Sequence, residues 1–358
     1  MNQKTILFAA FMISILVAFI AKDIRAGTGK RTGTAGATEL LIPVGSVGAS
    51  LSGNYTAGIG GAEAMFWNPA GIANTSNAAE VLVSHTKTIG DIGLNYAAVL
   101  ADFKKFGYLG ISIKSLDFGD IPVTTEYATD GTGETYSPSY VIFGSTYGRR
   151  MTDRILFGFS AKIISEQIMN VSATGAAFDF GVQVDLQNGA RIGVSLRNFG
   201  TGMRFDGNDL ERRVDLPNSI SEPIGQKEDL RIVSQKFEYP TTIDIGAAYT
   251  RRFAGGHTVT VMTDFLNHHF GFDGYGGGAE YTFHMEKFKF SLRTGATARV
   301  NPDNDKILFH NDENIFGVSF GGGIRVELAR QLNLGLDYSY RMTALLADNQ
   351  WFSATIGF

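Results

Sequence analysis

The chain ends in the stretch Trp351-Phe-Ser-Ala-Thr-Ile-Gly-Phe358, in which apolar residues alternate with small or polar ones. Successive side chains of a strand point to opposite faces, so one face is shared by Phe352, Ala354, Ile356 and Phe358. An alternating strand with an aromatic carboxyl terminus is typical of the last strand of an outer-membrane β-barrel. We therefore expect Phe352, Ile356 and Phe358 to serve membrane insertion and barrel closure.

The other end of the chain reads as an export signal. Lys4 supplies a basic start, residues 5–21 form an apolar run, and Ala26 precedes a candidate cleavage point. A retained membrane helix is the alternative, but the apolar run is short for a full span. We predict a signal peptide at 1–26, a plug segment at 27–78 and a barrel at 79–358.

The composition excludes several classes of protein. The sequence has no Cys, which rules out a disulfide framework, a cysteine metal site and a lipid-anchored amino terminus. A hydrophobic content of 44% is too low for a helical membrane protein and ordinary for a barrel, whose strands alternate. A formal net charge of −4 in a signal-bearing chain argues against nucleic acid as a partner.

Alternating runs of the length that crosses a bilayer recur from residue 79 onward. The clearest is 331–341, where leucine or tyrosine occupies every second position. We predict an all-β fold, a transmembrane antiparallel β-barrel of about 14 strands. The predicted strands are 79–89, 92–102, 106–116, 139–149, 154–165, 174–185, 189–198, 241–251, 257–266, 275–284, 287–298, 315–326, 331–341 and 350–358.

Short and long connections alternate between these strands. After a short first loop, tight turns are predicted at 102–105, 150–153, 186–188, 252–256, 285–286 and 327–330, and longer loops at 117–138, 166–173, 199–240, 267–274, 299–314 and 342–349. Outer-membrane barrels have short periplasmic turns and longer extracellular loops. A soluble β-sandwich is the alternative, but it needs no apolar outer face on strand after strand. The alternation of short turns and long loops therefore predicts that the protein lies in the outer membrane of a Gram-negative-type bacterium.

The segment before the first strand is too long for a simple lead-in. Fourteen strands enclose a lumen wider than their own side chains fill, so this Gly-rich and Ala-rich segment is expected to be a plug or hatch. Its stretch Gly60-Gly-Ala-Glu-Ala-Met-Phe-Trp-Asn-Pro-Ala-Gly-Ile-Ala73 resembles the amino-terminal signature of PorV/PorQ-like proteins in the FadL-like outer-membrane barrel superfamily. The resemblance implies a partner role in type IX protein secretion, or uptake of hydrophobic compounds such as long-chain fatty acids.

The plug contains one turn motif, Asn68-Pro69-Ala70-Gly71. Asn bonds its own backbone in turns, Pro fixes φ, and Gly permits a crowded or left-handed position. We expect a structural corner that anchors the plug under the barrel wall, with direct ligand contact as the alternative. Phe66 and Trp67 are expected to pack the plug on the wall rather than to form a binding cage.

Charged residues occupy the face of the strands that we expect to line the lumen. They are Lys162, Asp179, Asp185, Arg191, Arg197, Asp244, Asp264, Arg293, Arg325, Asp337 and Arg341. A pore selective for one ionic solute needs one sign of charge to dominate, and neither does. We expect these charges to pair across the lumen or with the plug.

The sequence carries no nucleophile elbow, HExxH motif or phosphate-binding loop, so no enzyme activity, catalytic residue or cofactor is predicted. His268, His269 and Asp273 are poorly spaced for a metal ion, and the acidic stretch 301–313 lacks the ligand order of a calcium loop. We expect ordinary solvated loops at both places and predict no metal site.

Two functions remain, and the fold alone does not separate them. The first is a non-enzymatic secretion scaffold or shuttle, whose outer loops bind exported proteins or a translocon; the apolar content of loop 199–240 favours it. The second is a transporter that moves a hydrophobic ligand past a movable hatch. Both need outer-membrane lipid and the barrel assembly machinery as partners.

Overall fold

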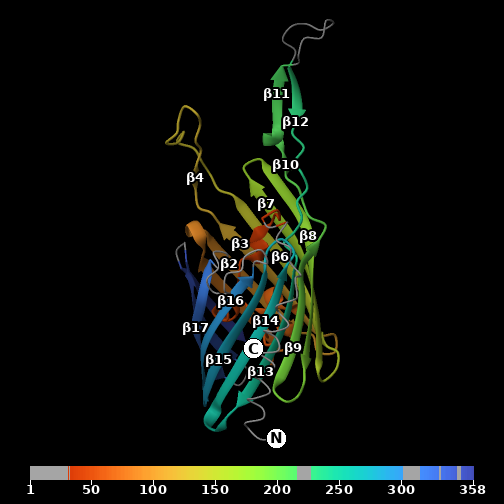
Figure 1. Cartoon of the computed structure of the whole chain (residues 1–358), viewed down its shortest axis with the longest axis vertical. Helices are drawn as coiled ribbons and strands as arrows, with labels where there is room; N and C mark the ends of the chain where they lie inside the picture. The colour runs from red at the N-terminus through yellow and green to blue at the C-terminus, as the bar shows by residue number, and fades with distance from the viewer. Residues whose placement is uncertain (1–30, 32, 216–226, 301–314, 330–331, 345–347) are drawn as a thin grey trace.

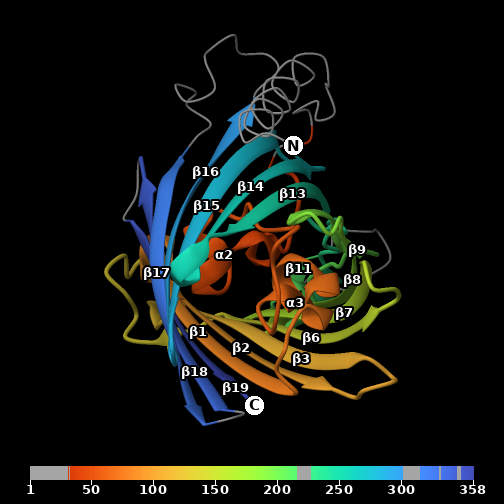
Figure 2. The ribbon, with the colours of Figure 1, turned by 90° about the horizontal axis from the view of Figure 1, so that it is seen from below.

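The computed structural model describes residues 31, 33–215, 227–300, 315–329, 332–344 and 348–358. The predicted signal peptide at 1–26 lies outside the described residues. Fourteen strands form one closed antiparallel barrel, in which β1 pairs with β19 (Figure 1, Figure 2). They are β1 (Ala79–Lys87), β2 (Gly93–Asp102), β3 (Tyr108–Asp117), β6 (Ser139–Arg150), β7 (Ile155–Ile168), β8 (Val171–Asp185), β9 (Ala190–Gly200), β13 (Thr242–Arg252), β14 (His257–His268), β15 (Asp273–Met285), β16 (Phe288–Val300), β17 (Phe316–Ala329), β18 (Leu332–Thr343) and β19 (Asn349–Gly357).

The apolar face of the strands points outward, as an outer-membrane barrel requires. Ile111 and Leu292 are each 65% exposed on the outer surface, whereas the inward Ser160 and Ser195 are buried. The sequence prediction of an all-β barrel with fourteen strands is therefore confirmed. Among the described residues, no helix has the length and apolarity that a membrane span needs.

The strand β19 closes the barrel. The backbone N–H of Phe358 donates to the carbonyl of Ala79 at 2.8 Å, and the carbonyl of Phe358 accepts the N–H of Ala78 at 2.6 Å. Phe352, Ile356 and Phe358 face outward and are 54%, 37% and 50% exposed. The aromatic end of the chain thus lies on the lipid-facing surface, at the seam with β1.

The two ends of the barrel differ. The turn end carries the tight turns that follow β2, β6, β8, β13, β15 and β17, and the loop end carries the other connections. The loop end holds the small elements η3 (Ile89–Asp91), β4 (Ile121–Pro122), β5 (Thr135–Tyr136), β10 (Asp206–Gly207), η4 (Asn208–Leu210), β11 (Glu211–Asp215) and β12 (Lys227–Arg231), and the turn end holds η5 (Ala254–Gly256). The β11–β12 hairpin projects beyond the mouth of the barrel (Figure 1).

One predicted loop is wrong. Residues 166–173 are not a loop, because β7 and β8 continue their pairing up to Ile168 and Val171 and turn at Met169 and Asn170. The two strands extend here because the inward side chains of Glu166 and Ala173 are buried against the loop-end half of the plug. The strict alternation of short turns and long loops fails here, and it fails again between β14 and β15, where only residues 269–272 connect the two strands.

The described residues between 33 and 78, before β1, lie inside the lumen (Figure 2). They form the short elements η1 (Thr38–Leu41), α2 (Ser46–Ser50), α3 (Ala64–Trp67) and η2 (Pro69–Ala73). Ile59, Met65 and Ile72 of this plug pack with inward Leu82 and Leu100 of β1 and β2 in the largest buried cluster. Each fully buried aliphatic side chain stabilises by about 1.5–3 kcal/mol. The core of the molecule is therefore the interface between plug and wall.

Candidate functional site

The corner at Asn68 is completely buried. The Asn68 Oδ1 atom accepts the N–H of Ala70 at 3.1 Å and caps η2, and its Nδ2 atom donates to the carbonyl of Thr56 at 2.9 Å. Pro69 occupies the first position of η2, where a missing N–H costs nothing. One side chain thus joins two stretches of the plug.

Glycines on three adjacent strands receive this corner. Gly148 of β6 lies opposite Gly158 of β7, and Gly158 lies opposite Gly181 of β8. A Cβ atom on Gly158 would lie 2.1 Å from the carbonyl carbon of Pro69, and one on Gly181 would lie 2.0 Å from Oδ1 of Asn68. We call these three residues the glycine seat. The plug backbone rests on it with no room for any side chain.

The aromatic pair beside the corner contacts both plug and wall. The ring of Trp67 is buried, and its Nε1 donates to the carbonyl of Val44 at 3.2 Å. Phe66 packs edge-on against Trp67, with the ammonium of Lys114 at 4.8 Å and the guanidinium of Arg197 at 5.5 Å from its ring centre. The pair therefore packs between wall cations and the plug core.

The other half of the plug contacts β15 to β19 through small polar side chains. The hydroxyl groups of Ser46 and Ser353 lie 2.7 Å apart, and those of Ser52 and Ser319 lie 2.8 Å apart. Asn54 Nδ2 donates to the carbonyl of Ala296 at 3.1 Å. We call Ser46, Ser52, Asn54 and their wall partners the serine contact.

Most of the predicted lumen charges pair within the barrel. Lys162 lies 2.7 Å from Asp179, Arg197 lies 2.6 Å from Asp244, and Arg293 lies 2.7 Å from Asp337. Arg293 also binds Glu280, at 2.5 Å, a residue that the sequence analysis did not select. These pairs lie on neighbouring or nearly neighbouring strands, so they hold the wall rather than line an open ionic channel.

The remaining predicted charges lie apart from these pairs. Arg191 contacts Asp185 at 3.3 Å at the turn end, where both are part-exposed. Arg325 lines a cavity at the same end. Asp264 is buried beside Gly246, whose added Cβ would lie 2.1 Å from the Asp264 carboxylate. The structure does not gather the predicted charges into one site.

A buried carboxyl pair near the loop end was missed by the sequence analysis. Glu39 of η1 and Glu166 of β7 are both buried, and their carboxyl groups lie close enough to influence each other. Burial raises the pKa of Glu39 above its ordinary value. Lys114 lies beside them and donates to the carbonyls of Glu39 and Ile42 at 2.7 and 2.6 Å. Isolated polar residues in a Gly-rich segment give no sequence signal for such a pair.

A second buried carboxyl group, Glu63, fixes the centre of the plug. Its Oε1 atom accepts the N–H of Gly48 in α2 at 2.7 Å. Burial raises the pKa of Glu63 to about 7, with a further contribution from the negative charge of Asp337. An added Cβ on Gly45 would lie 2.2 Å from the Glu63 carboxyl carbon, so glycine is needed there. The protonation of Glu63 is therefore coupled to the position of α2.

An outer cavity of about 390 Å³ lies in the lumen on the loop-end side of the plug. Its apolar lining includes Trp67 and Trp351, the two tryptophans of the sequence. Its charged side chains, among the described residues, are all basic or His: Arg197, His268, Arg299 and Arg341. This space is suited to an apolar molecule with an anionic group.

Arg341 is the clearest candidate contact for such a group. Its guanidinium stacks on Phe316 at 4.3 Å, and its Nε atom is buried without a hydrogen-bond partner among the described residues. The buried Oδ1 atom of Asn349, in the same lining, also lacks a partner there. Buried polar groups without partners are costly, so a ligand that supplies hydrogen bonds is favoured here.

An inner cavity of about 420 Å³ lies on the turn-end side of the plug. It is polar and mixed in charge, with Glu80, Glu286, Lys289 and Arg325 in its lining. Ala49 and Ser52 line the outer cavity, whereas Val47 and Tyr55 line the inner one. The plug segment from α2 to Tyr55 therefore separates the two spaces.

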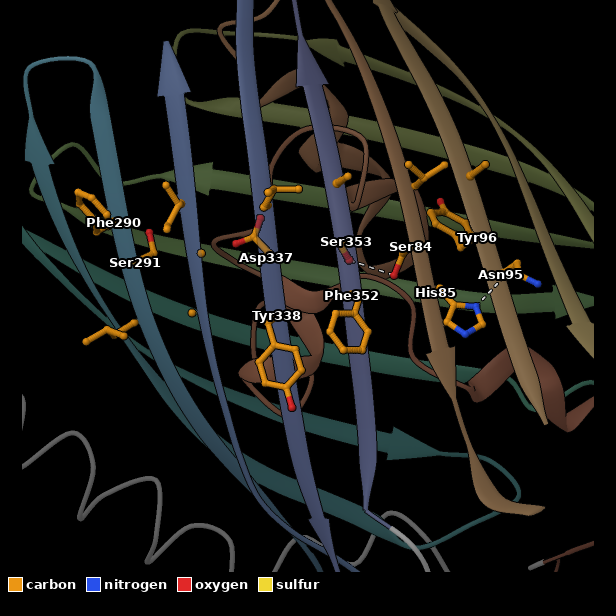
Figure 3. A pocket seen from close by; sticks show the side chains of 18 of the residues that line it. Ser84, His85, Asn95, Tyr96, Phe290, Ser291, Asp337, Tyr338, Phe352 and Ser353 are labelled. Atoms are coloured by element: carbon orange, nitrogen blue, oxygen red, sulfur yellow. Dashed lines mark hydrogen bonds between the residues drawn. The ribbon is translucent and has the colours of Figure 1, made fainter. Parts of the chain in front are cut away.

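A third and larger space, of about 1090 Å³, is a groove in the wall across β16 to β19 and β1 to β3. Tyr338, Phe352 and His85 project from neighbouring strands on its outer side (Figure 3). His85 Nδ1 lies 2.8 Å from Oδ1 of Asn95. The strand pairing below the groove is continuous, so the backbone of the wall divides it from the lumen. The groove belongs to the lipid-facing surface.

The residues that the sequence analysis considered for a metal site lie apart in the structure. Among the described residues, no three His, Cys, Asp or Glu side chains are placed to hold a metal ion. His268 lines the outer cavity, His269 contacts Arg31 at 2.9 Å, and Asp273 accepts from Asn267 at 2.7 Å, so they do not converge. The acidic stretch 301–313 lies outside the described residues.

These features define a class: an outer-membrane β-barrel of fourteen strands with an amino-terminal segment inside the lumen. No family model and no curated protein sequence matches the chain. Solved structures do match it, and they show that the fold is that of FadL-like outer-membrane barrels.

Three matches illustrate the likeness. The Pseudomonas putida toluene transporter TodX has a TM-score of 0.55 at 11% identity, over 88% of this chain and 98% of that one. A Pseudomonas aeruginosa FadL homologue has a TM-score of 0.54 at 10% identity, over 88% and 98%. The monoaromatic hydrocarbon channel CymD has a TM-score of 0.55 at 10% identity, over 89% and 98%. Identities this low establish the shared fold and leave the PorV/PorQ resemblance a prediction.

Proposed function

We propose that this protein transports hydrophobic small molecules that carry an anionic group across the outer membrane, from the loop end to the turn end. The outer cavity carries the proposal, because its lining combines apolar side chains with arginines. The similar solved structures include hydrocarbon channels and a toluene transporter, which favours the second of the two functions predicted from sequence.

The mechanism follows from the order of the spaces along the lumen. An apolar ligand gains about 25 cal/mol for each Å² of surface that it buries in the outer cavity. Its anionic group would lie at Arg341, where a charge-assisted hydrogen bond replaces an unpartnered donor. Passage then requires displacement of the segment from α2 to Tyr55, which separates the two cavities.

Trp67 and Trp351 give a direct test, because both tryptophans line the outer cavity. We expect ω-bromoundecanoate to quench the fluorescence of the purified, refolded barrel in a saturable way, and undecanoate to compete. Arg341→Gln should weaken this binding about tenfold, the effect of losing one charge-assisted hydrogen bond. Trp351→Phe should remove part of the quenching, which locates the brominated acid at this cavity.

Two outcomes would contradict the proposal. Quenching that grows linearly and ignores a competitor would mean that the acid only partitions into detergent. Equal affinity for bromobenzene and for the brominated acid would leave the arginines without a role, and neutral hydrocarbons would become the substrate class. Uptake of the labelled acid by proteoliposomes, compared with empty vesicles, then tests transport itself.

The secretion role remains a second candidate because of one observation. The β11–β12 hairpin projects from the mouth of the barrel (Figure 1). Leu230, Ile232 and Val233, at the end of β12 and just after it, are 49%, 53% and 77% exposed. Exposed apolar clusters of this kind often bind proteins. Deletion of 207–236 should leave quenching by the brominated acid intact. If it also abolishes capture of an exported protein, the secretion function is supported.

A further inference from the structure

The turn end of the barrel carries a repeated pattern of exposed apolar residues. In each of its six turns, a charged residue or His is followed directly by an apolar residue that is 46% to 62% exposed among the described residues. The pairs are Asp102-Phe103, Arg150-Met151, Asp185-Leu186, Arg252-Phe253, His284-Met285 and Glu327-Leu328. We call the six apolar residues the turn-end belt.

The turn geometry fixes where these side chains point. The N–H groups of Phe103, Met151, Leu186 and Phe253 each donate to the carbonyl four residues later, at 2.8 to 2.9 Å. Each therefore continues its strand by one residue on the outward face, in line with exposed residues such as Val99 and Tyr249. The belt encircles the barrel at the height where the lipid-facing wall ends.

The charges around the belt are mostly positive. The exposed basic residues of the described turns and strand ends are Lys104, Lys105, Arg149, Arg150, Arg154, Arg252 and Lys287, and the exposed acidic ones are Asp153, Glu286 and Glu327. Arg251 also lies over the ring of Phe253, at 5.2 Å from its centre. The turn end therefore combines apolar anchors with an excess of basic groups.

The loop end has the opposite balance. Its exposed acidic residues, within the described part of the chain, are Asp91, Asp117, Asp120, Glu126, Asp130, Glu134, Asp206, Asp209, Glu211, Asp229, Glu238 and Asp348. The exposed basic ones there are Arg31, Lys87, Arg204, Arg212, Arg231 and Lys236. The sequence as a whole is acidic, so the positive turn end does not follow from overall composition.

We propose that the turn-end belt and its basic neighbours bind the headgroups of anionic phospholipid in the periplasmic leaflet. Short turns lie on the periplasmic side of outer-membrane barrels. Basic residues near a lipid surface attract anionic headgroups, and long basic side chains reach the headgroups while their stems stay on apolar surface. An acidic protein partner would match the positive charge of the turn end, but it would not explain why Phe103 and Phe253 point outward, toward the lipid.

The test compares two matched variants of the full chain in phosphatidylcholine bilayers that contain some phosphatidylglycerol. The turn-end variant carries K104Q, K105Q, R149Q, R251Q and K287Q, in which Arg149 and Arg251 share the outward face with Met151 and Phe253. The control carries K87Q, R204Q, R212Q, R231Q and K236Q at the loop end. Electron paramagnetic resonance of spin-labelled lipids reports the relative association of each lipid with the barrel. Heat-modifiable migration in gels confirms that each variant is folded.

We expect the wild type to prefer phosphatidylglycerol over phosphatidylcholine at least threefold, since one basic residue near an anionic surface is worth roughly fivefold. The turn-end variant should lose the preference, and the control should keep it. About 1 M salt should also remove it, because the screening length then falls to about 3 Å. Equal association of the two lipids with the wild type would overturn the proposal, as would a preference that survives in the turn-end variant.

Discussion

Two of the contacts between the plug and the barrel wall differ in kind. At the glycine seat, plug backbone lies against strand backbone, and the corner Asn68–Gly71 lines none of the cavities found among the described residues. At the serine contact, hydroxyl and amide groups bridge the surfaces, and Ser52 borders the outer cavity. Plug backbone meets a wall glycine here at one place, where a Cβ atom on Gly295 would lie 2.4 Å from the carbonyl carbon of Leu51. One contact is sealed, and the other lies next to empty space.

The difference indicates which half of the plug moves. Backbone packed on glycine has no second arrangement of equal energy, because any shift opens a void or a clash. A hydroxyl group that leaves a serine partner can bond to water, so each such bond contributes only about 0.5–1.5 kcal/mol net. Plug backbone meets three wall glycines at the corner and one, Gly295, at Leu51, and only the α2 half borders the two cavities. We infer that the segment from α2 to Tyr55 swings away from the wall more easily than the corner does.

The largest effect is expected when the glycine seat is filled. In Gly158→Ala, the new methyl group would lie 2.1 Å from the Pro69 carbonyl carbon, so the corner must leave the wall. Overpacking typically costs 1–3 kcal/mol, and contact with backbone places this change at or above about 3 kcal/mol. We expect measurable conductance in planar bilayers, where the wild type should conduct little.

The matched control is Gly277→Ala on β15. Its nearest atom would be the carbonyl oxygen of Met262 at 3.5 Å, which is ordinary contact. This variant should behave as the wild type. If Gly158→Ala also leaves conductance and plug exchange unchanged, the corner is not an anchor and the comparison fails.

The second-largest effect is the pH dependence of the docking of α2, which Glu63 controls. When α2 is docked in the lumen beside Glu63, the pKa of Glu63 is about 7, whereas a solvated glutamate titrates near 4.5. The docked state therefore retains a proton that the released state loses, so the free energy of docking is greatest below about pH 4.5. It falls as pH rises and levels off above about 7, after a loss of roughly 3 kcal/mol, since each pKa unit corresponds to 1.36 kcal/mol.

Amide hydrogen exchange at Gly48 measures this effect, after correction for the intrinsic pH dependence of exchange. The Gly48 N–H donates to Glu63, so its protection reports the docking of α2. Glu63→Gln keeps an acceptor and should give protection that is flat between pH 4.5 and 7. A wild-type profile that is equally flat would show that Glu63 does not control α2.

The sequence predicted the barrel well because its signals are local. Alternation along one strand separates its two faces, and the fourteen strands follow from it one at a time. The export signal, the aromatic end and the loop lengths together indicate which face meets lipid. The loop predicted at 166–173 failed because tertiary burial of Glu166 against Glu39 extends the strands, and no local pattern records such a contact. The Asn68 corner was predictable as a turn, since turn chemistry is also local.

The site was predictable only in part. The lumen charges could be selected by strand position, but their partners depend on which strands are neighbours, and Glu280 was missed for that reason. Glu63 and Glu39 lie in a segment of short helices with no periodic pattern, so their burial could not be expected. In the sequence, the inward glycines of the seat look like any other small residue of an alternating strand. Their role becomes visible only when the position of the plug is known.

A smaller effect is expected at the corner itself. Asn68→Ala removes the cap of η2 and the bond to the Thr56 carbonyl. Loss of a helix cap costs about 0.5–2 kcal/mol, so docking should weaken by about 2 kcal/mol once the buried carbonyl is included. Faster amide exchange of Ala70, with α2 still protected, is the expected result. Asn68→Asp should recover part of the loss, because it retains the capping oxygen.

The smallest effect is expected at the serine contact, and it decides whether the two contacts differ. Ser46→Ala and Ser353→Ala each remove one partner of a 2.7 Å hydroxyl pair, and the double variant removes both. A double-mutant cycle of these three variants and the wild type isolates the interaction energy between the two hydroxyl groups. We expect this energy to be about 0.5–1 kcal/mol, measured by the amide exchange of α2. Both single variants should speed uptake of the labelled acid, because α2 then leaves more easily. An interaction energy above about 3 kcal/mol would make the serine contact as rigid as the glycine seat, and the inferred swing of α2 would have to be abandoned.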